Sequence, residues 1–415
     1  MQKKRVVVTG MGVVSCFGSD VNHFYNELLA GKSGITPITS FDCSDYPTRF
    51  AGSVKEDYNI DDFMDKKQAR RVDPFIRYGM VAAKKALLDS GLDLAQVDKT
   101  RAGIIVGSGM GGISTFYEGA ATIKEKSYRR LSPFFIPFII TNMAGALLAI
   151  DTGFMGPNYS TSTACATSNF TILQAARHIQ SGEADIMIAG GTEAPINPVG
   201  LSGFSTIKAL SVRNDSPQTA SRPWDKERDG FVIGEGAAVL ILEEYEYAKK
   251  RGATILAEVL GGGFSCDAYH ITEPHPEGNG LILAFEKTLA DAGITKERVN
   301  YINAHATSTS VGDVAEIHGI KKYFGEHSKN ITVNATKSMI GHSLGAAGAI
   351  EAVVIIKALQ TGLIHPTANL VHPEECLAPL DPVIGKAKKL DVDVALSNSF
   401  GFGGHNSCVA FSHVR

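Results

Sequence analysis

The chain has 415 residues, of which 44% are apolar and 20% charged, and 40 basic against 43 acidic side chains give a net charge of −3. This length can bury a large core and suggests two or more domains, or one large duplicated unit. The nearly balanced charge argues against a dedicated nucleic-acid-binding protein. The six cysteines lie far apart with no CxxC pair, so we expect a reducing compartment, no disulfide framework and no metal site.

The chain begins with "MQKKRVVVTG", a short basic run that passes directly into a β-branched strand. It has neither the apolar region nor the cleavage site of a signal peptide. Two glycine motifs also follow strand-like runs, "GMGVVS" (10–15) and "GSGMGG" (107–112). A dinucleotide site further needs an immediate helix and an acidic residue at the end of the next strand. Neither is visible after Gly112, so we expect no nucleotide site.

Two basic clusters lie in the first third of the chain, "DKKQARR" (65–71) and "KEKSYRR" (124–130). Such clusters are usually solvated helix faces. They are also suited to docking an acidic partner through complementary charge. The residues alone leave both interpretations open.

The segment 131–150, "LSPFFIPFIITNMAGALLAI", has 20 residues without a charge. That length is sufficient to cross a membrane. Pro133 and Pro137 would leave backbone groups unsatisfied in lipid, and Thr141 and Asn142 interrupt the apolar run. We therefore predict a buried core segment and no membrane span.

Cys165 stands among small residues in "STSTACATSN" (160–169), just before a helical pattern of apolar residues. An extended approach, a turn and a helix form the elbow that presents a nucleophile beside a backbone N–H. A helix N-terminus also lowers the pKa of a nearby thiol. A lone cysteine is more often an inert buried group, so this segment by itself allows either role.

Several segments of the first half of the chain are echoed in the second half. Each has the same plan of a helix end, a glycine stop, a loop and a buried strand, or of a strand that runs into glycines. We infer a duplication, joined near the polar segment 243–253, with domains 1–250 and 251–415. The strands are fully apolar, so we expect mainly parallel sheets with helices on both faces. Catalytic groups should then gather where strand ends of both halves meet. The matched segments are 86–109 with 287–309, 181–194 with 391–404, and the helix after Cys165 with 344–362.

Two histidines follow corresponding elements of this plan. His305 lies in "NAHATST" (303–309), and His342 lies in "ATKSMIGHSLGAAG" (335–348) together with Lys337. Neutral imidazoles can donate a hydrogen bond to a carbonyl oxygen that gains negative charge, and a lysine nearby can set their charge state. A single histidine would more often be a core or capping group, but two beside an elbow cysteine favour a catalytic site.

The segment "NSFGFGGHN" (398–406) places three glycines around Phe402. It can be a simple tight turn. It can also be a mobile gate in which the N–H of Phe402 joins that of Cys165 in an oxyanion hole.

Together these motifs resemble the elongating β-ketoacyl-[acyl-carrier-protein] synthases (synthase I/II) of the thiolase-like superfamily. The resemblance runs from "VVVTGMGVVS" to "SNSFGFGGHNS" and includes "STACATSN", "NATKSMIGHSLGAAG" and "NSFGFGG" in the same order. It implies an α/β, duplicated, layered αβαβα fold with two mostly parallel or mixed sheets.

The resemblance also implies roles for individual residues. The catalytic set comprises Cys165 as nucleophile, His305 and His342 as the decarboxylation pair, Lys337 as their support and Phe402 as the gate. The implied substrate-binding residues are Met110, Thr272, Thr307, Thr309 and Gly403, with Met110 in the acyl pocket. Acidic supporting groups match Asp313, Glu316 and Glu351. The implied carrier-protein docking residues are Lys67, Arg70, Arg71, Arg129, Arg130 and Lys208.

We therefore expect a decarboxylative condensation of an acyl thioester with a malonyl thioester, through an acyl-Cys165 intermediate. No metal or redox cofactor is expected, because both substrates arrive on the phosphopantetheine arm of acyl carrier protein. The resemblance further implies a homodimer with the acyl pocket near the subunit boundary. Met110 replaces a common isoleucine, which leaves the preferred chain length open. Ala306 and His405 are closer to plastid-type members, so plastid stroma is the alternative to a bacterial cytoplasm.

Four other functions are weighed against this one. A thiolase acting on acyl-coenzyme A would need a second cysteine, for which Cys408 is the candidate. An initiating synthase would carry asparagine in place of His342. A non-catalytic partner subunit would lack the nucleophile, and a cysteine hydrolase would transfer the acyl group to water.

Overall fold

The apolar, β-branched runs of both halves form one mixed ten-stranded sheet in residues 3–414, the part of the chain that the computed structural model describes. Its strand order is β11-β9-β8-β13-β14-β7-β1-β6-β5-β4. Parallel pairs lie toward both edges, and the central strands pair antiparallel. The strands are β1 (Val6–Val14), β4 (Ala102–Gly107), β5 (Ile186–Glu193), β6 (Gly236–Glu244), β7 (Ala257–Cys266), β8 (Val299–Asn303), β9 (Thr332–Asn334), β11 (Asp381–Pro382), β13 (Val394–Gly401) and β14 (His405–Ser412).

The two halves repeat one strand order outward from the centre. From β1 the order is β6, β5, β4, and from β7 it is β14, β13, β8, so both halves place their first, fourth, third and second long strands in sequence. The two half-sheets meet where Val6–Val8 pair with residues 257–259. The expected two sheets are therefore continuous along this short junction. Gly91 and Gly293, matched in the sequence, both end their helices in the left-handed conformation, with φ of 60° and 64°.

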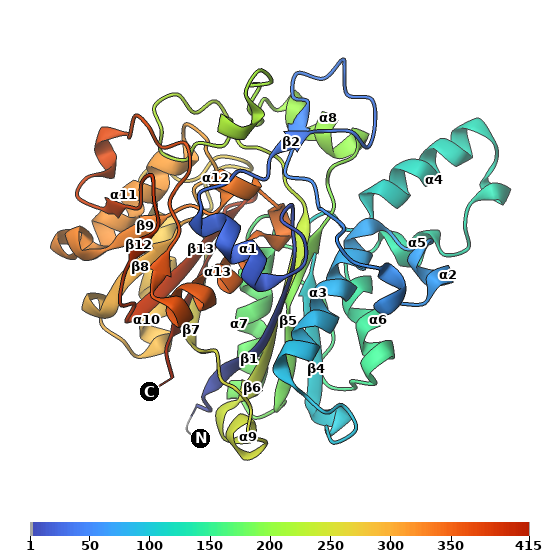
Figure 1. Ribbon diagram of the computed structural model, residues 1–415, viewed down its shortest axis with the longest axis horizontal. Coiled ribbons are helices and arrows are strands. Elements are labelled where there is room, and N and C mark those ends of the chain that lie inside the picture. Colours follow the sequence, from blue (N-terminus) through green and yellow to red (C-terminus); the bar gives the residue numbers. More distant parts are fainter. Residues whose placement is uncertain (1–2, 415) are drawn as a thin grey trace.

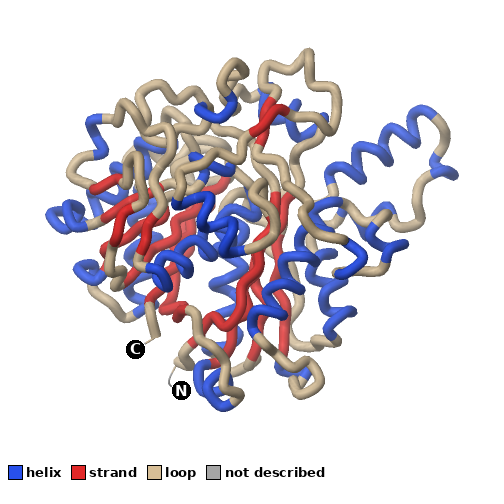
Figure 2. Tube along the Cα trace, viewed as in Figure 1, coloured by secondary structure: helices blue, strands red, loops and turns tan. Residues whose placement is uncertain are grey.

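Helices cover both half-sheets and also separate them, which confirms the layered αβαβα arrangement (Figures 1 and 2). One outer core lies between the first half-sheet and the helices α3 (Pro74–Ser90) and α6 (Met143–Thr152). The other lies between the second half-sheet and the helices α10 (Asn279–Ala292) and α11 (Gly312–Phe324). Between the half-sheets, α7 (Thr167–Gln180) and α13 (Ala347–Thr361) form the central core.

The remaining elements are short and lie mostly at the ends of the strands. They comprise two small sheets, further α-helices and 3₁₀ turns. The small sheets pair β2 (Thr36–Pro37) with β3 (Phe50–Ala51), and β10 (Leu363–Ile364) with β12 (Lys388–Lys389). The other helices are α1 (Val21–Leu29), α2 (Lys66–Ala69), α4 (Ile113–Glu125), α5 (Phe135–Ile139), α8 (Pro198–Thr206), α9 (Tyr245–Lys250) and α12 (Lys337–Ile340). The 3₁₀ turns are η1 (Ile60–Asp62), η2 (Lys99–Arg101), η3 (Tyr128–Arg130), η4 (Pro217–Thr219), η5 (Lys296–Arg298), η6 (Gly325–Asn330), η7 (Leu344–Ala346) and η8 (Glu375–Leu377).

The apolar segment 131–150 is divided between α5 and α6 and is only partly buried. Ala144 and Leu148 pack inward, whereas Ile136 is 60% exposed and Ile150 79% exposed. The expectation of a buried core segment is therefore wrong for much of this run, which instead lies on the surface beside α4. Among the described residues, a different stretch, Leu344–Thr361, is long and apolar enough to cross a membrane. This stretch comprises η7 and α13 in the central core, and 83% of it is buried.

Candidate active site

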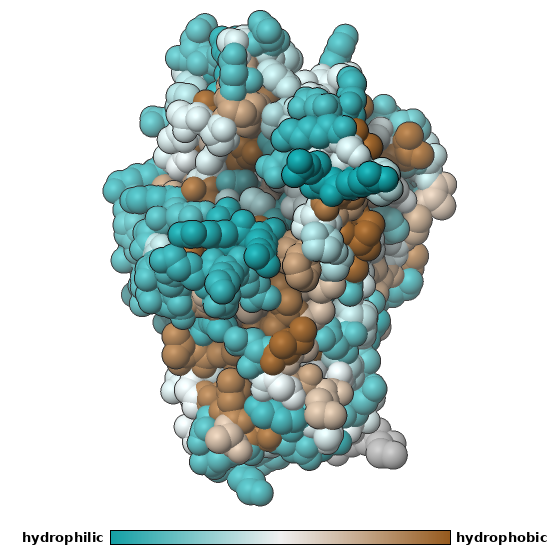
Figure 3. Space-filling model, turned by 90° about the vertical axis from the view of Figure 1, so that its right-hand side faces the viewer, coloured by the Kyte–Doolittle hydropathy of each residue, from teal (hydrophilic) through white to brown (hydrophobic). Residues whose placement is uncertain are grey.

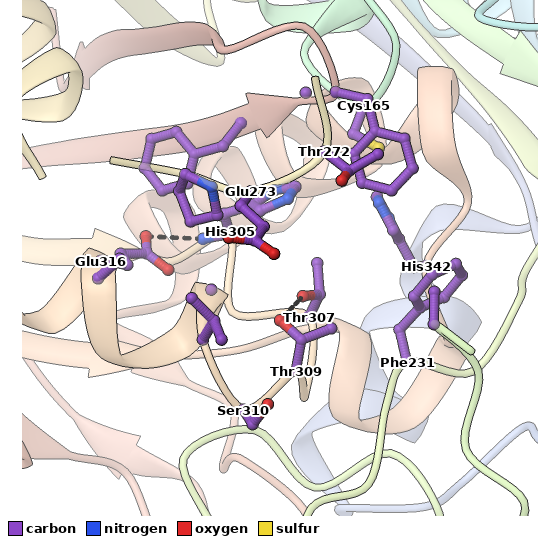
Figure 4. Close-up of a pocket in the computed structure, with 18 of the residues that line it drawn as sticks. Cys165, Phe231, Thr272, Glu273, His305, Thr307, Thr309, Ser310, Glu316 and His342 are labelled. Carbon is purple, nitrogen blue, oxygen red and sulfur yellow. Dashed lines mark hydrogen bonds between the residues drawn. The ribbon is translucent and has the colours of Figure 1, made fainter. Parts of the chain in front are cut away.

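A cavity of about 590 Å³ is lined by residues from both halves of the chain. Cys165 and Phe231 contribute from the first half, and His305, His342 and Phe402 from the second. His305 follows β8, and Phe402 follows β13. Residues of both halves therefore meet in this cavity, as expected, but the strand ends that contribute, β8 and β13, both belong to the second half. Figure 4 shows the imidazole of His342 extending toward the sulfur of Cys165.

Cys165 lies at a tight turn two residues before α7. Ala164 takes a φ of 48°, in the left-handed region that a residue with a side chain rarely adopts. On the other side, a Cβ added to Gly401 would come within 2.5 Å of the Thr163 carbonyl oxygen, so only a glycine backbone fits there. The expected elbow is present. Its approach is not a full strand, since only isolated bridges form there, such as Asn158 with Ile104.

The thiol of Cys165 is protonated in this cavity, because burial raises its pKa to about 12. The positive charge of Lys337 lowers the pKa, as do the backbone N–H groups of Cys165 and Phe402, but burial outweighs them. The lowering of the pKa that is expected at the helix N-terminus is therefore present, but it does not give a thiolate at rest. The two N–H groups nevertheless converge beside the sulfur, which is the arrangement that an oxyanion hole requires.

His305 and His342 face each other across the cavity. Their ring centroids are 5.3 Å apart with an interplanar angle of 87°. Within the described residues, Nδ1 of His305 and both ring nitrogens of His342 have no hydrogen-bond partner. These nitrogens are therefore available to a bound carbonyl oxygen.

Backbone hydrogen bonds hold the two histidines in place and leave their rings uncommitted. The N–H groups of His305 and Ala306 donate to Glu316, over 2.9 and 2.8 Å (Figure 4). The N–H of His342 donates to the Val232 carbonyl over 2.7 Å and its carbonyl accepts from the N–H of Gly234 over 2.9 Å, so an isolated parallel bridge to Ile233 determines its position. Glu316 thus supports the site through the backbone.

Lys337 and Glu351 form a buried ion pair behind the imidazoles. Their Nζ–Oε1 distance is 2.5 Å, and both side chains are 1% exposed. Burial raises the pKa of Glu351 to about 7, while Lys337 opposes that rise. Burial, followed by the charge of Lys337, lowers the pKa of His342 and of His305 well below 6.5. Both imidazoles are therefore neutral at neutral pH, the state in which each ring has one donor and one acceptor nitrogen.

Phe402 and Gly403 lie in the tight connection between β13 and β14. Phe402 lines the cavity and is 36% exposed, and Gly403 has a φ of 90°. The N–H of Gly403 donates to Ile271 over 2.8 Å, which joins this connection to the exposed loop that carries Thr272. The gating role of Phe402 stays a prediction.

Thr307 and Thr309 line the cavity with their hydroxyls 3.1 Å apart, and Thr272 lies across from them (Figure 4). Asp313 holds this turn by accepting from the N–H groups of Ser308 and Thr309. Arg228, which the sequence interpretation missed, donates to the carbonyl groups of residues 309 and 310 over 2.9 and 2.8 Å. The turn that carries Thr307 and Thr309 is therefore held through both its backbone N–H groups and its backbone carbonyl groups.

Met110 is placed differently from its prediction. It packs, partly buried, against the apolar cluster that contains Cys165, Leu201 and Leu344, but it does not line the cavity. A role at the acyl end of the site is compatible with that packing. It requires the cavity to extend from Cys165 toward this cluster.

The predicted docking residues are all exposed and belong to three places on the surface. The three places are α2 with the residues just after it, η3, and the residues just after α8. Of the predicted docking residues, only Lys208, after α8, lines the cavity. Arg71 lies over the ring of Phe134, 5.8 Å from its centroid, so the first group adjoins α5. The groups are Lys67 with Arg70 and Arg71, Arg129 with Arg130, and Lys208.

Two aromatic residues of the site gave no signal in the sequence that could be separated from ordinary core packing, whereas a nearby carboxylate gave a signal that was overlooked. Phe231 lies edge-on to His342, and Phe400 lies edge-on to His305. Glu193 is a fully buried carboxylate at the end of β5. Its signal was an acidic residue at the end of an apolar strand, two positions after a pair of glycines, in "IMIAGGTE".

Comparison with known proteins decides the family. The model of the β-ketoacyl synthase N-terminal domain matches residues 3–248, and that of the C-terminal domain matches residues 256–371. The chain belongs to the β-ketoacyl synthase family. A chloroplastic 3-oxoacyl-[acyl-carrier-protein] synthase I from Arabidopsis thaliana is 57% identical, over 100% of this chain and 87% of that protein. A 3-oxoacyl-[acyl-carrier-protein] synthase 2 from Vibrio harveyi is 50% identical over the full length of both.

Solved structures of ketosynthases share the fold. A β-ketoacyl synthase from Burkholderia phymatum superposes with a TM-score of 0.90 at 34% identity, covering 99% of this chain and 100% of that one. A type II PKS ketosynthase in complex with its acyl-carrier protein gives 0.91 at 32% identity, covering 100% of both chains. The fold of this β-ketoacyl synthase is therefore thiolase-like, and the protein is an acyltransferase.

The thiolase alternative fails on the position of the second cysteine. Cys408 is fully buried in the core between β14 and α10, and it does not line the cavity. His342 is present where an initiating synthase would carry asparagine. The geometry therefore agrees with the elongating members of the β-ketoacyl synthase family.

Proposed function

We propose that this β-ketoacyl synthase condenses an acyl-[acyl-carrier-protein] with malonyl-[acyl-carrier-protein] to give 3-oxoacyl-[acyl-carrier-protein] and carbon dioxide. One observation supports this most strongly. A cysteine beside two converging N–H groups faces the same cavity as two buried, neutral imidazoles, in which Nδ1 of His305 and both ring nitrogens of His342 have no partner among the described residues. The first set suits acyl transfer, and the second suits stabilisation of an enolate.

In the first half-reaction, the sulfur of Cys165 attacks the acyl thioester carbonyl. The N–H groups of Cys165 and Phe402 hold the oxyanion. Collapse of the tetrahedral intermediate breaks the bond to the carrier sulfur and leaves the acyl group on Cys165. The thiol proton, which burial retains on Cys165 at rest, ends on the departing carrier thiol.

In the second half-reaction, the malonyl thioester oxygen lies between His305 and His342. The bond to the carboxylate breaks, carbon dioxide leaves, and the electron pair forms an enolate whose oxygen accepts hydrogen bonds from the imidazoles. The enolate carbon attacks the acyl-Cys165 carbonyl, the bond to the cysteine sulfur breaks, and the departing thiolate takes up one proton from water. The product is a ketone two carbons longer.

The neutral imidazoles predict a pH dependence. Decarboxylation of a malonyl thioester should not decline as the pH falls through 6.5, because burial and Lys337 hold the pKa of His305 and His342 well below that value. The free energy of unfolding should behave differently. Below pH 6.5 the unfolded chain binds more protons at these two positions, so stability decreases as the pH falls. Initial rates of carbon dioxide release and urea midpoints across this range measure both, and a rate that falls with a midpoint near 6.5 contradicts the assignment.

The partner that suits this site is acyl carrier protein. A thioester on a long flexible arm would reach Cys165 past the hydroxyls of Thr307 and Thr309, and the exposed cations named above, which include Lys208 at the cavity mouth, suit an acidic partner. The acyl groups are carried by that arm, so no separate cofactor is proposed. The compartment stays a prediction, a bacterial cytoplasm with plastid stroma as the alternative.

A homodimer is the assembly that suits the exposed apolar face. Monomeric proteins rarely expose large contiguous apolar patches. Figure 3 shows apolar side chains gathered among polar ones on the face formed by α4–α6. We expect light scattering to give twice the chain mass. Ile136→Glu, at a position 60% exposed, should shift the mass toward one chain, while Leu88→Glu, 76% exposed on α3, should not. A monomeric wild-type mass overturns the dimer.

The proposed function is tested with acyl-carrier and malonyl-carrier substrates. Intact mass should show one acyl group on the enzyme after the first substrate. Addition of the second should release that group as a 3-oxoacyl-carrier two carbons longer, with one carbon dioxide per product. Release of a free fatty acid instead identifies a hydrolase, and no adduct at all identifies a non-catalytic subunit.

A further inference from the structure

Glu193 is a buried carboxylate that the reaction does not use. It is fully buried at the end of β5, and four donors saturate it. Oε1 accepts from the hydroxyl of Ser108 over 2.7 Å and from the N–H of Met110 over 3.0 Å. Oε2 accepts from the N–H groups of Gly109 and Gly345 over 2.8 and 2.9 Å.

These donors come from opposite halves of the chain. Residues 108–110 follow β4 and carry Met110, and Gly345 belongs to η7, which begins two residues after His342. The approach is close enough at position 345 to require glycine, because an added Cβ would lie 2.5 Å from Glu193 Oε2 and 2.6 Å from the backbone nitrogen of Gly109. The two loops therefore approach each other through one carboxylate.

The same loops form part of the apolar environment of Cys165. Met110 and Leu344 belong to the cluster that contains Cys165, and Leu344 lines the cavity. The carbonyl of Ser108 accepts from Ser162, which precedes Cys165 by three residues. Movement of either loop would displace Met110 or Leu344 relative to the sulfur.

We propose that Glu193 is a positioning residue that fixes the acyl end of the cavity by holding the Met110 loop against the turn that carries Leu344. This rests on the proposed function, since it assigns that apolar cluster to the acyl chain on Cys165. A carboxylate suits the role because it can accept four hydrogen bonds at once and donates none. A glutamine offers one oxygen, and its amide N–H groups would face backbone donors.

Glu193→Gln should therefore impair long acyl groups more than short ones. Only one of the two oxygens remains, so either the N–H of Met110 or the N–H groups of Gly109 and Gly345 lose their acceptor, and Met110 or Leu344 loses its fixed place. A long chain needs that preformed wall, whereas an acetyl group does not reach it. We expect the rate of Cys165 acylation to fall about ten- to a hundred-fold for a long-chain carrier substrate, with the acetyl rate and malonyl decarboxylation close to wild type.

The second readout is the pH profile of Cys165 alkylation by iodoacetamide. The negative charge of Glu193 raises the pKa of this thiol, so its removal should move the alkylation midpoint to lower pH. The shift shows that Glu193 is ionised beside the nucleophile, while the chain-length bias tests its positioning role. The alkylation measurement needs no carrier substrate, so it remains informative if the enzyme proves not to be a condensing synthase.

Glu243→Gln is the matched control. Glu243 is another fully buried carboxylate of the same sheet, bound to Arg251 and distant from the cavity lining. It should lower the melting temperature and leave both the chain-length profile and the alkylation midpoint unchanged.

If Glu193→Gln does not fold, Ser108→Ala removes one of the four donors and should give a smaller effect with the same chain-length bias. Equal loss for all chain lengths overturns the proposal. Failure of the wild type to form any acyl adduct overturns the proposed function instead.

Discussion

Cys165→Ala is expected to abolish acyl-enzyme formation and ketone synthesis while decarboxylation of a malonyl thioester continues. The substitution removes the only sulfur that lines the cavity among the described residues. It leaves the ion pair of Lys337 with Glu351 and the backbone bonds of His305 and His342 intact. Loss of a nucleophile typically costs about four or more orders of magnitude in rate. The two half-reactions should therefore separate in one variant.

Intact mass after incubation with acyl-carrier measures the first effect, and carbon dioxide release from malonyl-carrier measures the second. Cys408→Ala provides the control, since that thiol is also buried but lies in the core outside the cavity. It should retain the acyl adduct. An adduct of wild-type yield on the Cys165→Ala protein would show that another residue is the nucleophile.

The positions of the main reactive groups could be predicted because they follow short-range rules. The turn before α7 places Cys165, and the ends of β8 and β13 place His305 and Phe402. The paired segments of the two halves indicated a duplication, and the repeated strand order agrees with it. The outline of the fold and the meeting of these groups are thus encoded in local patterns.

Properties that depend on the surroundings could not be predicted in the same way. The pKa of Cys165 is decided by burial, which no neighbouring residue in the sequence reveals, and burial outweighs the helix terminus. Glu193 and Arg228 act on backbone groups far away in the chain. The exposure of α5 likewise depends on what packs against it, since an apolar run of that composition is typical of a core. Such features arise from long-range packing.

His342→Asn should have the opposite effect to Cys165→Ala. The N–H and carbonyl of residue 342 bond to Val232 and Gly234, so the turn does not depend on the imidazole. An asparagine side chain is shorter and cannot place a donor where the unpaired ring nitrogen lies. The developing enolate then loses one of two stabilising contacts, which typically costs about a hundred- to a thousand-fold in rate.

Carbon dioxide release should therefore be almost lost in the His342→Asn protein, while intact mass still shows acylation of Cys165. His327→Asn supplies the control, because that imidazole bonds the Val299 carbonyl on the far side of β8 from the cavity and should affect neither step. Decarboxylation at the wild-type rate in His342→Asn would refute the two-imidazole assignment. Because the pKa of Cys165 is high, some base must accept the thiol proton during attack. Simultaneous loss of acylation would mean that His342 is that base. The relative size of the two losses thus determines whether one imidazole serves one half-reaction or both.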